Sequence, residues 1–213
     1  MKAWHFTASD RRLGYDDGRL VEPGKTLVHP GELVLCESGL HASKRLIDAL
    51  QYAPGPYVWR VELGGTILRG SDKLVASART ALWGVDATDI LRRFARKCAM
   101  DVIHLWDAPE VVIRYLQTGD ESIRAAASAA AWAATSAATS AATRAAASAA
   151  ASAATWAATW DAAWNAAATW DAAWNAASAA AWDAAAWDAA RAAARDRQNR
   201  RLTALVSRGR SCQ

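Results

Sequence analysis

Two residues of the sequence are close enough together to be ligands of the same metal ion. Cys36 and His41 lie five positions apart, and a thiolate and an imidazole are both ligands for zinc. His29 and His104 would have to converge on them to complete a site. A structural zinc site uses four ligands, usually supplied as closely spaced pairs, and these residues are not paired in that way. We therefore predict no metal, with a small buried thiol at Cys36 and a turn histidine at His41.

The first third of the chain predicts the strands that would position these residues. Residues 1–7 are short, apolar and aromatic, which indicates a first strand that presents His5. Residues 32–36 (ELVLC) indicate another strand, which leads into a tight turn at Gly39. Ser43 is a good N-cap for a helix over residues 44–53.

Alternation and turn residues then predict a run of strands. Residues 57–63 (YVWRVEL) alternate apolar and polar side chains, and Gly64-Gly65 would turn this strand into residues 66–68. A second turn is expected at residues 70–72. Residues 73–83 fit both strand and helix, and a strand is preferred because their apolar residues do not follow a helical period.

Two helices follow the predicted strands. The first spans residues 89–105 after a cap at Thr88, with an inward face of Leu91, Phe94, Cys98, Val102 and Leu105. The second begins near Pro109 and ends at Gly119. The predicted fold is an α+β domain over residues 1–120, a small mixed or antiparallel sheet with helices. An Ala/Trp-rich helical region over residues 121–202 and a basic tail over residues 203–213 follow.

The helical region is dominated by alanine. Between residues 125 and 194, 42 of 70 residues are alanine and eight are tryptophan, with no glycine or proline. Alanine has the highest helix propensity, so a long helix, or several shorter ones, is expected. A ten-residue unit, TWDAAWNAAA from residue 159, is nearly repeated from residue 169.

Six indoles of this region share an arc of about 120° on a helical projection. They are Trp156, Trp160, Trp164, Trp170, Trp174 and Trp182. Trp132 and Trp187 fall outside the arc. Soluble proteins rarely leave such an apolar row uncovered, so we predict helix packing or self-association through these residues. A membrane-surface helix, an ice-binding helix and a β-solenoid are weaker alternatives, and the frequent Ser and Thr argue against a membrane-spanning segment.

Charge is concentrated at the C-terminus. The chain carries a net charge of +4, and residues 191–213 contribute seven arginines against one aspartate. Arg197, Arg200 and Arg201 are candidates for phosphate contacts, with salt-sensitive and non-specific affinity for nucleic acid. Arginines at the end of a helix also offset its macrodipole without any ligand.

A family resemblance rests on several segments taken together. It is carried by Gly24-Lys25-Thr26, Cys36-Glu37-Ser38-Gly39-Leu40-His41-Ala42, the helix at 46–52, the strand at 58–65 and Asp72-Lys73-Leu74-Val75-Ala76. This order resembles an uncharacterised domain of bacteriophage and bacterial proteins that carry alanine-rich tails. The resemblance covers about residues 1–85 and the segment 197–202, and it implies no particular activity.

The order of elements is also similar, more distantly, to the ADP-ribosyltransferase fold. That similarity implies NAD as a cofactor and makes His5, His41 and Ser43 weak catalytic candidates. Leu40 stands where an aromatic residue would stack on nicotinamide, and the strand at 73–82 lacks the catalytic glutamate. Glu62 is the nearest carboxylate, on a different strand.

The preferred interpretation is a non-enzymatic interaction protein without a cofactor, encoded by a phage or mobile element. A protein partner or a second copy would bind through the helical region, and an inhibitor of a host defence system fits this build. The alternative is a NAD-dependent ADP-ribosyltransferase-like enzyme. The chain begins without an apolar signal segment and has three scattered cysteines, so we expect a cytoplasmic location, in the host cell if phage-encoded.

Overall fold

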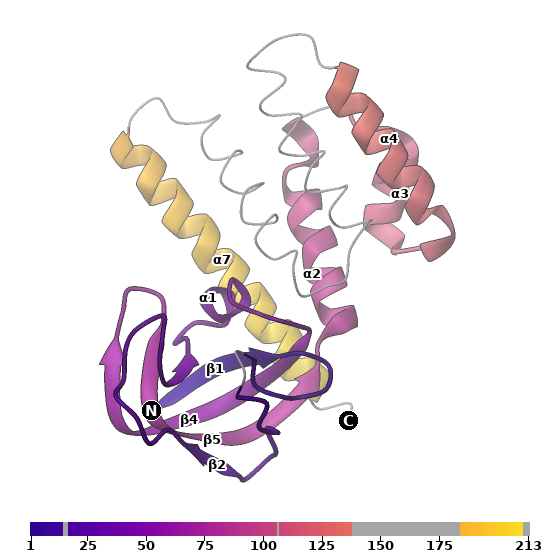
Figure 1. The fold of residues 1–213 in the computed structure, drawn as a ribbon. Coiled ribbons are helices and arrows are strands. Elements are labelled where there is room, and N and C mark those ends of the chain that lie inside the picture. The colour runs from indigo at the N-terminus through magenta and orange to yellow at the C-terminus, as the bar shows by residue number, and fades with distance from the viewer. Residues whose placement is uncertain (15–16, 106, 138–183, 211–213) are drawn as a thin grey trace. The chain divides into compact units, whose positions relative to one another are not determined.

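The structure is a computed structural model that describes residues 1–14, 17–105, 107–137 and 184–210. Its contacts divide these residues into two compact units. The first consists of residues 1–90 and 202–210, and the second of residues 91–137 and 184–201. Each unit has its own hydrophobic core, and Figure 1 shows the elements of both by colour, with labels on most of them.

Among the described residues, five strands form one antiparallel sheet in the first unit. They are β1 (Lys2–Thr7), β2 (Thr26–Val28), β3 (Leu40–Ala42), β4 (Tyr57–Arg69) and β5 (Leu74–Asp86). The strands pair in the order β1-β4-β5-β2, and β3 pairs with another stretch of β5. The predicted α+β class, with a small antiparallel sheet followed by helices, is confirmed at this level.

One backbone bridge joins the two ends of this sheet. The N–H of Trp4 in β1 donates to the Ser43 carbonyl at 2.8 Å, and the Ser43 N–H donates back to Trp4 at 2.9 Å. Since β3 pairs with β5, the ladder runs from β1 through β4, β5 and β3 and returns to β1. The sheet therefore curls around an interior.

The bridge also corrects the predicted role of Ser43. Ser43 is not a helix N-cap, because its backbone extends the strand pairing. The helix α1 spans only Leu46–Leu50, and its N-cap is Arg45, whose side chain makes no capping bond. The helix predicted over residues 44–53 was therefore too long at both ends.

The core of the first unit fills the interior of the curled sheet. Its buried members are Ala3, Val21, Leu27, Leu40, Ala42, Trp59, Val61, Leu63, Leu74, Ala76 and Ala81. The alternation of β4 places Trp59, Val61 and Leu63 inside, as predicted for a half-buried strand.

The predicted strand over residues 32–36 is wrong. These residues form a tight turn in which the N–H groups of Glu37 and Ser38 both donate to the Val34 carbonyl. Cys36 has a φ of 70°, which is incompatible with an extended strand. Cys36 is also exposed in this turn, so the prediction of a buried thiol is wrong. The turn satisfies backbone groups locally that a strand would have paired with a neighbour.

The predicted turn at Gly64-Gly65 is also wrong. β4 continues through both glycines, and a register shift between Gly64 and Ile67 absorbs them as a bulge. The N–H of Thr66 donates to Ser77 Oγ at 3.0 Å, which holds the bulge against β5. The hairpin turn lies at Gly70, as predicted for residues 70–72, where the Gly70 N–H donates to the Lys73 carbonyl.

The helices follow their local signals closely. α2 spans Thr88–Asp101, a 3-10 turn η1 covers Ile103–Leu105, and α3 spans Glu110–Thr118. The predicted inward face of the first helix is buried at Leu91, Phe94, Cys98 and Val102. The cap differs from the prediction, because Asp86 Oδ1 rather than Thr88 accepts the first free N–H.

α4 (Arg124–Ala137) packs against α3 through alanine, after a 3-10 turn η2 (Glu121–Ile123). Ala127 and Ala131 are buried beside Tyr115 and Leu116. Because the alanine side chain is small, the two helices can approach each other closely. Trp132 lies away from this contact and is 67% exposed.

The alanine tract is helical at both of its described ends. α4 covers its beginning, and α7 (Ala184–Arg210) covers its end. The six indoles of the predicted row lie outside the described residues. The continuous helix and its packing through tryptophan therefore stay predictions.

Candidate anion-binding site

The most unusual side chain of the first unit is a buried arginine. Arg79 of β5 lies opposite Leu63 of β4 and Leu27 of β2. Directly opposed residues of antiparallel strands point to the same face, so Arg79 enters the side of the sheet occupied by the core. It is only 3% exposed. Arg79 is thus a cation inside an apolar interior.

The hydrogen bonding of Arg79 is incomplete. Its Nη1 donates to the carbonyl oxygen of His41 at 2.5 Å, whereas Nη2 is buried and has no partner. Burial lowers the pKa of Arg79 to about 9, with Asp17 raising it and Arg19 lowering it. The guanidinium therefore remains charged at neutral pH. A buried charge left without compensation costs roughly 3–5 kcal/mol.

His5 approaches the same point from β1. It lies opposite Trp59, so it also faces the core, and its Nε2 is buried without a partner. Burial lowers the pKa of His5 well below its usual value, and the neighbouring Arg79 and His41 lower it further. A hydrogen bond to the backbone of His41 acts in the opposite direction. His5 is therefore neutral at pH 7, with its Nδ1 bonded and its Nε2 free.

The ring of His41 is fully engaged. Its Nε2 accepts from the N–H of Cys36 at 3.1 Å, and its Nδ1 lies 3.1 Å from the Gly39 carbonyl. The first contact requires an unprotonated Nε2, which places the proton on Nδ1. Burial is the main cause that lowers the pKa of His41 and keeps this form. The ring holds the turn at 36–41, while the carbonyl anchors Arg79.

Close packing around Gly39 supports this turn. Gly39 has a φ of 118°, and a Cβ there would lie 2.4 Å from Val75 Cγ2. Only glycine fits both the backbone conformation and the space. The predicted tight turn at Gly39 is thus also a point of close approach between β3 and β5.

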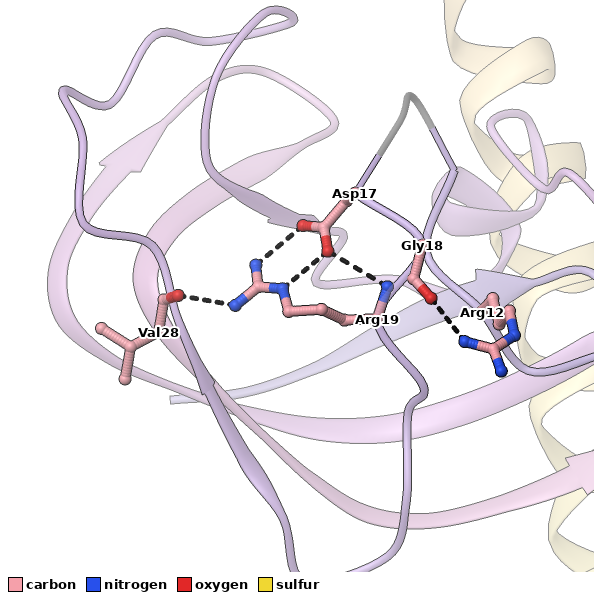
Figure 2. A network of polar contacts seen from close by, with 5 residues as sticks. All are labelled: Arg12, Asp17, Gly18, Arg19 and Val28. Atoms are coloured by element: carbon pink, nitrogen blue, oxygen red, sulfur yellow. Dashed lines mark hydrogen bonds and ion pairs between the residues drawn. The ribbon is translucent and has the colours of Figure 1, made fainter.

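A neighbouring ion pair leaves Arg79 without a carboxylate. The Arg19 guanidinium donates to both carboxylate oxygens of Asp17, at 2.6 Å and 2.7 Å, and to the Val28 carbonyl of β2 at 2.8 Å (Figure 2). Arg12 adds a bond to the Gly18 carbonyl at 2.8 Å. Asp17 is therefore paired with Arg19, and it acts on Arg79 only as a more distant charge.

The structure brings two of the three predicted catalytic candidates together. His41 lies close enough to His5 to affect its pKa, whereas Ser43 contributes its backbone to the bridge with Trp4. Arg79 was missed by the sequence reasoning. The sequence feature that could have pointed to Arg79 is its position as a lone arginine in the apolar stretch of β5, between Ala78 and Ala81.

The arginines predicted to contact phosphates have different surroundings. Arg201 forms a two-bonded ion pair with Asp101, at 2.7 Å and 3.1 Å. Arg197 and Arg200 are exposed on α7. Arg210, at the end of the same helix, lies 4.9 Å from the ring centroid of Trp83.

The residues around His5 do not fit NAD in the manner of an ADP-ribosyltransferase. Leu40 is 3% exposed and belongs to the core, so it offers no surface to nicotinamide. Glu62 is exposed and lies opposite Lys2. Because side chains alternate along β1, Lys2 and Glu62 face away from the side that holds His5.

Two further findings concern the described residues only. No group of three or more His, Cys, Asp or Glu side chains among them is arranged to hold a metal ion. None of the helices in the described part of the chain combines the length and apolarity needed to cross a membrane.

The two neutral histidines predict acid sensitivity. Because the fold lowers the pKa of His5 and His41, the unfolded chain binds more protons below about pH 6.5. The stabilisation is complete above that pH and is lost as the pH falls toward the folded pKa values. We expect urea unfolding free energies to drop between pH 7.5 and 5.5. The double substitution His5→Gln, His41→Gln should flatten this drop, whereas His104→Gln, at an exposed position, should leave it unchanged. An equally steep drop in the double variant would contradict the assignment.

Comparison with models of protein families finds a similarity over the first unit. The model of a family described as Domain of unknown function (DUF7666) matches residues 1–93. No significant match was found among curated proteins or among solved structures. The predicted resemblance to an uncharacterised domain is confirmed for these residues, which include all five strands and the surroundings of Arg79.

Proposed function

We propose that the first unit binds a small anionic ligand without catalysing a reaction, as the recognition part of an interaction protein. The observation that carries the proposal is the Nη2 of Arg79, a buried and charged donor with no partner. Folded proteins pair nearly all such groups, because an unsatisfied charged donor is costly. An anion would supply the missing acceptor and the missing charge.

Binding is favoured over catalysis by the state of the neighbouring side chains. Both nitrogens of His41 are occupied by the turn that it holds, so this ring is not free to transfer a proton. The charged and titratable groups that shift the pKa of His5, among the described residues, are Arg79 and His41. A buried guanidinium that has no hydrogen bond to a carboxylate suits recognition of an anion better than acid–base chemistry.

The remaining parts of the sequence prediction extend this proposal. The Ala/Trp region would assemble copies of the chain or dock it on a protein partner, while Arg197 and Arg200 are exposed and open to phosphates. A phage or mobile-element origin, and inhibition of a host defence system, belong to the same proposal.

Sulfate provides a direct test, because it is a small anion of fixed charge. At constant ionic strength, sulfate should raise the melting temperature of the intact chain by a few degrees more than that of Arg79→Met, roughly 2–4 °C. Non-specific stabilisation by sulfate acts on all variants alike and cancels in this comparison. Methionine replaces the arginine with an apolar chain of similar reach.

Arg60→Met is the matched control. Arg60 lies on β4 and also donates one guanidinium bond to a backbone carbonyl, that of Ala3, but it stacks over Trp4 on the other face of the sheet. Its sulfate response should equal that of the unaltered chain. Equal responses in all three proteins would refute the proposal. A melting shift in millimolar NAD, together with release of nicotinamide, would instead support the ADP-ribosyltransferase alternative.

A further inference from the structure

We infer that one face of the second unit binds the phosphate backbone of a nucleic-acid duplex. The face carries four exposed cations, here named the basic row: Arg93 and Lys97 of α2, and Arg197 and Arg200 of α7. It is separate from Arg79, and its binding of a duplex rests on the phosphate contacts proposed above for Arg197 and Arg200. The contribution of α2 and the duplex as partner go beyond that proposal.

An ion pair fixes where α2 and α7 meet. Arg201 of α7 donates to both carboxylate oxygens of Asp101 in α2, at 2.7 Å and 3.1 Å. Nearer the start of α2, Ile90 lies against Gly209 of α7. Residue numbers therefore rise along α2 while they fall along α7, so the two helices run antiparallel.

Helical spacing then places the cations in line. Arg93 and Lys97 lie eight and four residues before Asp101, and residues four apart are neighbours on a helix surface. Arg197 lies four residues before Arg201 in the same way. Because the helices are antiparallel, the line that reaches Asp101 along α2 continues from Arg201 to Arg197. At 1.5 Å per residue, the line is roughly 18 Å long.

This line carries an excess of positive charge. Asp101 is the carboxylate within it, and Arg201 neutralises that charge. Arg200 adjoins Arg201 and is exposed. None of the four cations of the basic row forms an ion pair within the described part of the chain. Asp196 precedes Arg197 but lies about 100° away from it around α7. Four positive charges therefore remain open to an anionic partner.

The length and charge of the basic row match one strand of a duplex. Each strand carries a phosphate about every 3.4 Å along the duplex axis, so roughly 18 Å holds about five phosphates. Three of the four cations are arginines, whose guanidinium can donate two parallel N–H bonds to phosphate oxygens. A single strand is a poorer match, because single strands bind largely by stacking bases on aromatic side chains, and the basic row has none.

The surroundings of the basic row disfavour a membrane or an acidic protein as partner. The large apolar side chains of α2 in this unit, Leu91 and Phe94 among them, are buried, and the exposed neighbour of Arg197 one turn earlier on α7 is Ala193. Helices that lie on a membrane insert an apolar face, and protein interfaces have an apolar or aromatic centre. A phosphate backbone needs only positive charge and hydrogen-bond donors.

The test measures the affinity of the full chain for labelled DNA and RNA duplexes of about 20 base pairs, by fluorescence anisotropy over a range of salt concentrations. The duplex bound more tightly identifies the source of the phosphates. The double substitution Arg93→Gln, Lys97→Gln should weaken binding by about ten- to a hundredfold near 0.1 M salt. It should also reduce the slope of log K against log salt by about 1.8, which corresponds to two lost contacts. We expect the same changes for Arg197→Gln, Arg200→Gln.

Lys44→Gln, Arg69→Gln is the matched control, because it removes the same charge from exposed positions of the first unit. Its affinity and slope should equal those of the unaltered chain. Glutamine is a good helix former, and melting followed by circular dichroism checks that each variant folds. Should one pair of substitutions on the basic row impair folding, the other pair still decides the question.

The alternative outcomes each overturn a stated part of the inference. Unchanged binding in the folded variants of the basic row, or an equal loss in the control, would show that these cations are not the contact surface. Equal or tighter binding of a single strand of the same length overturns the duplex. Tighter binding to phosphatidylserine vesicles or to polyglutamate overturns the nucleic acid. Arg79→Met should leave duplex binding unchanged, so failure here does not affect the sulfate test of the first unit.

Discussion

Replacing Gly84 with alanine should destabilise the first unit by about 3 kcal/mol or more. Gly84 of β5 lies opposite Trp59, and a Cβ at this position would stand 2.5 Å from Trp59 Cε3 and 2.7 Å from Tyr57 Cε1. The indole cannot move aside easily, because it is fully buried and its Nε1 donates to Thr7 Oγ1 at 3.0 Å. Overpacking against a rigid ring forces either the strand or the core to shift.

Gly64→Ala is the matched control for this substitution. Gly64 lies on β4, and the nearest atom to a Cβ there is the Cβ of Ala78 at 3.8 Å, an ordinary contact. Denaturant unfolding, followed by tryptophan fluorescence, measures both variants. We expect the midpoint of Gly84→Ala to fall far below that of Gly64→Ala. Similar midpoints would mean that the indole does not lie over Gly84.

Removal of residues 202–213 should have an effect of similar or greater size. The described part of this segment belongs to the same compact unit as the sheet, and Gly209 lies close to Ile90. Leu202, Leu205 and Val206 are at most 6% exposed. Losing three buried aliphatic side chains costs roughly 5–8 kcal/mol, comparable to the whole stability of a typical domain.

Truncation after Arg210 is the control, because it leaves these three side chains in place. The chain truncated after Arg210 should melt at a temperature close to that of the full chain. The chain that lacks residues 202–213 should lose its cooperative unfolding transition, or show it at a lower temperature, when followed by circular dichroism. Retention of the full melting temperature in the longer truncation would show that residues 1–90 do not need the end of α7. A triple alanine substitution at the three buried positions, in the full-length chain, separates their burial from the loss of chain length.

Local signals in the sequence were sufficient for the elements that depend on near neighbours. β1, the hairpin turn at Gly70, the inward face of α2 and the bounds of α3 follow from apolar periodicity and from Pro109 and Gly119. These features are decided within a few residues, by backbone conformation and by which side of an element is apolar.

The sequence could not choose between local alternatives that a distant partner decides. Gly64-Gly65 is a turn signal by itself, but Ser77 on the paired strand accepts the Thr66 N–H and makes it a bulge. Residues 32–36 have the composition of a strand, but the His41 ring holds Cys36 in a turn. In both cases a single tertiary hydrogen bond outweighs a propensity of less than about 1 kcal/mol.

The candidate site shows the same division between sequence and tertiary structure. His5 and His41 were identifiable as polar residues in apolar or turn contexts, yet their roles differ because one ring is engaged and the other has a free nitrogen. The apolar stretch around Arg79 was too weak a signal by itself, since an arginine on a strand usually faces solvent. Only the closing of the sheet through Trp4 and Ser43, which places His5, Arg79 and the His41 backbone around one point, determines that this arginine is buried.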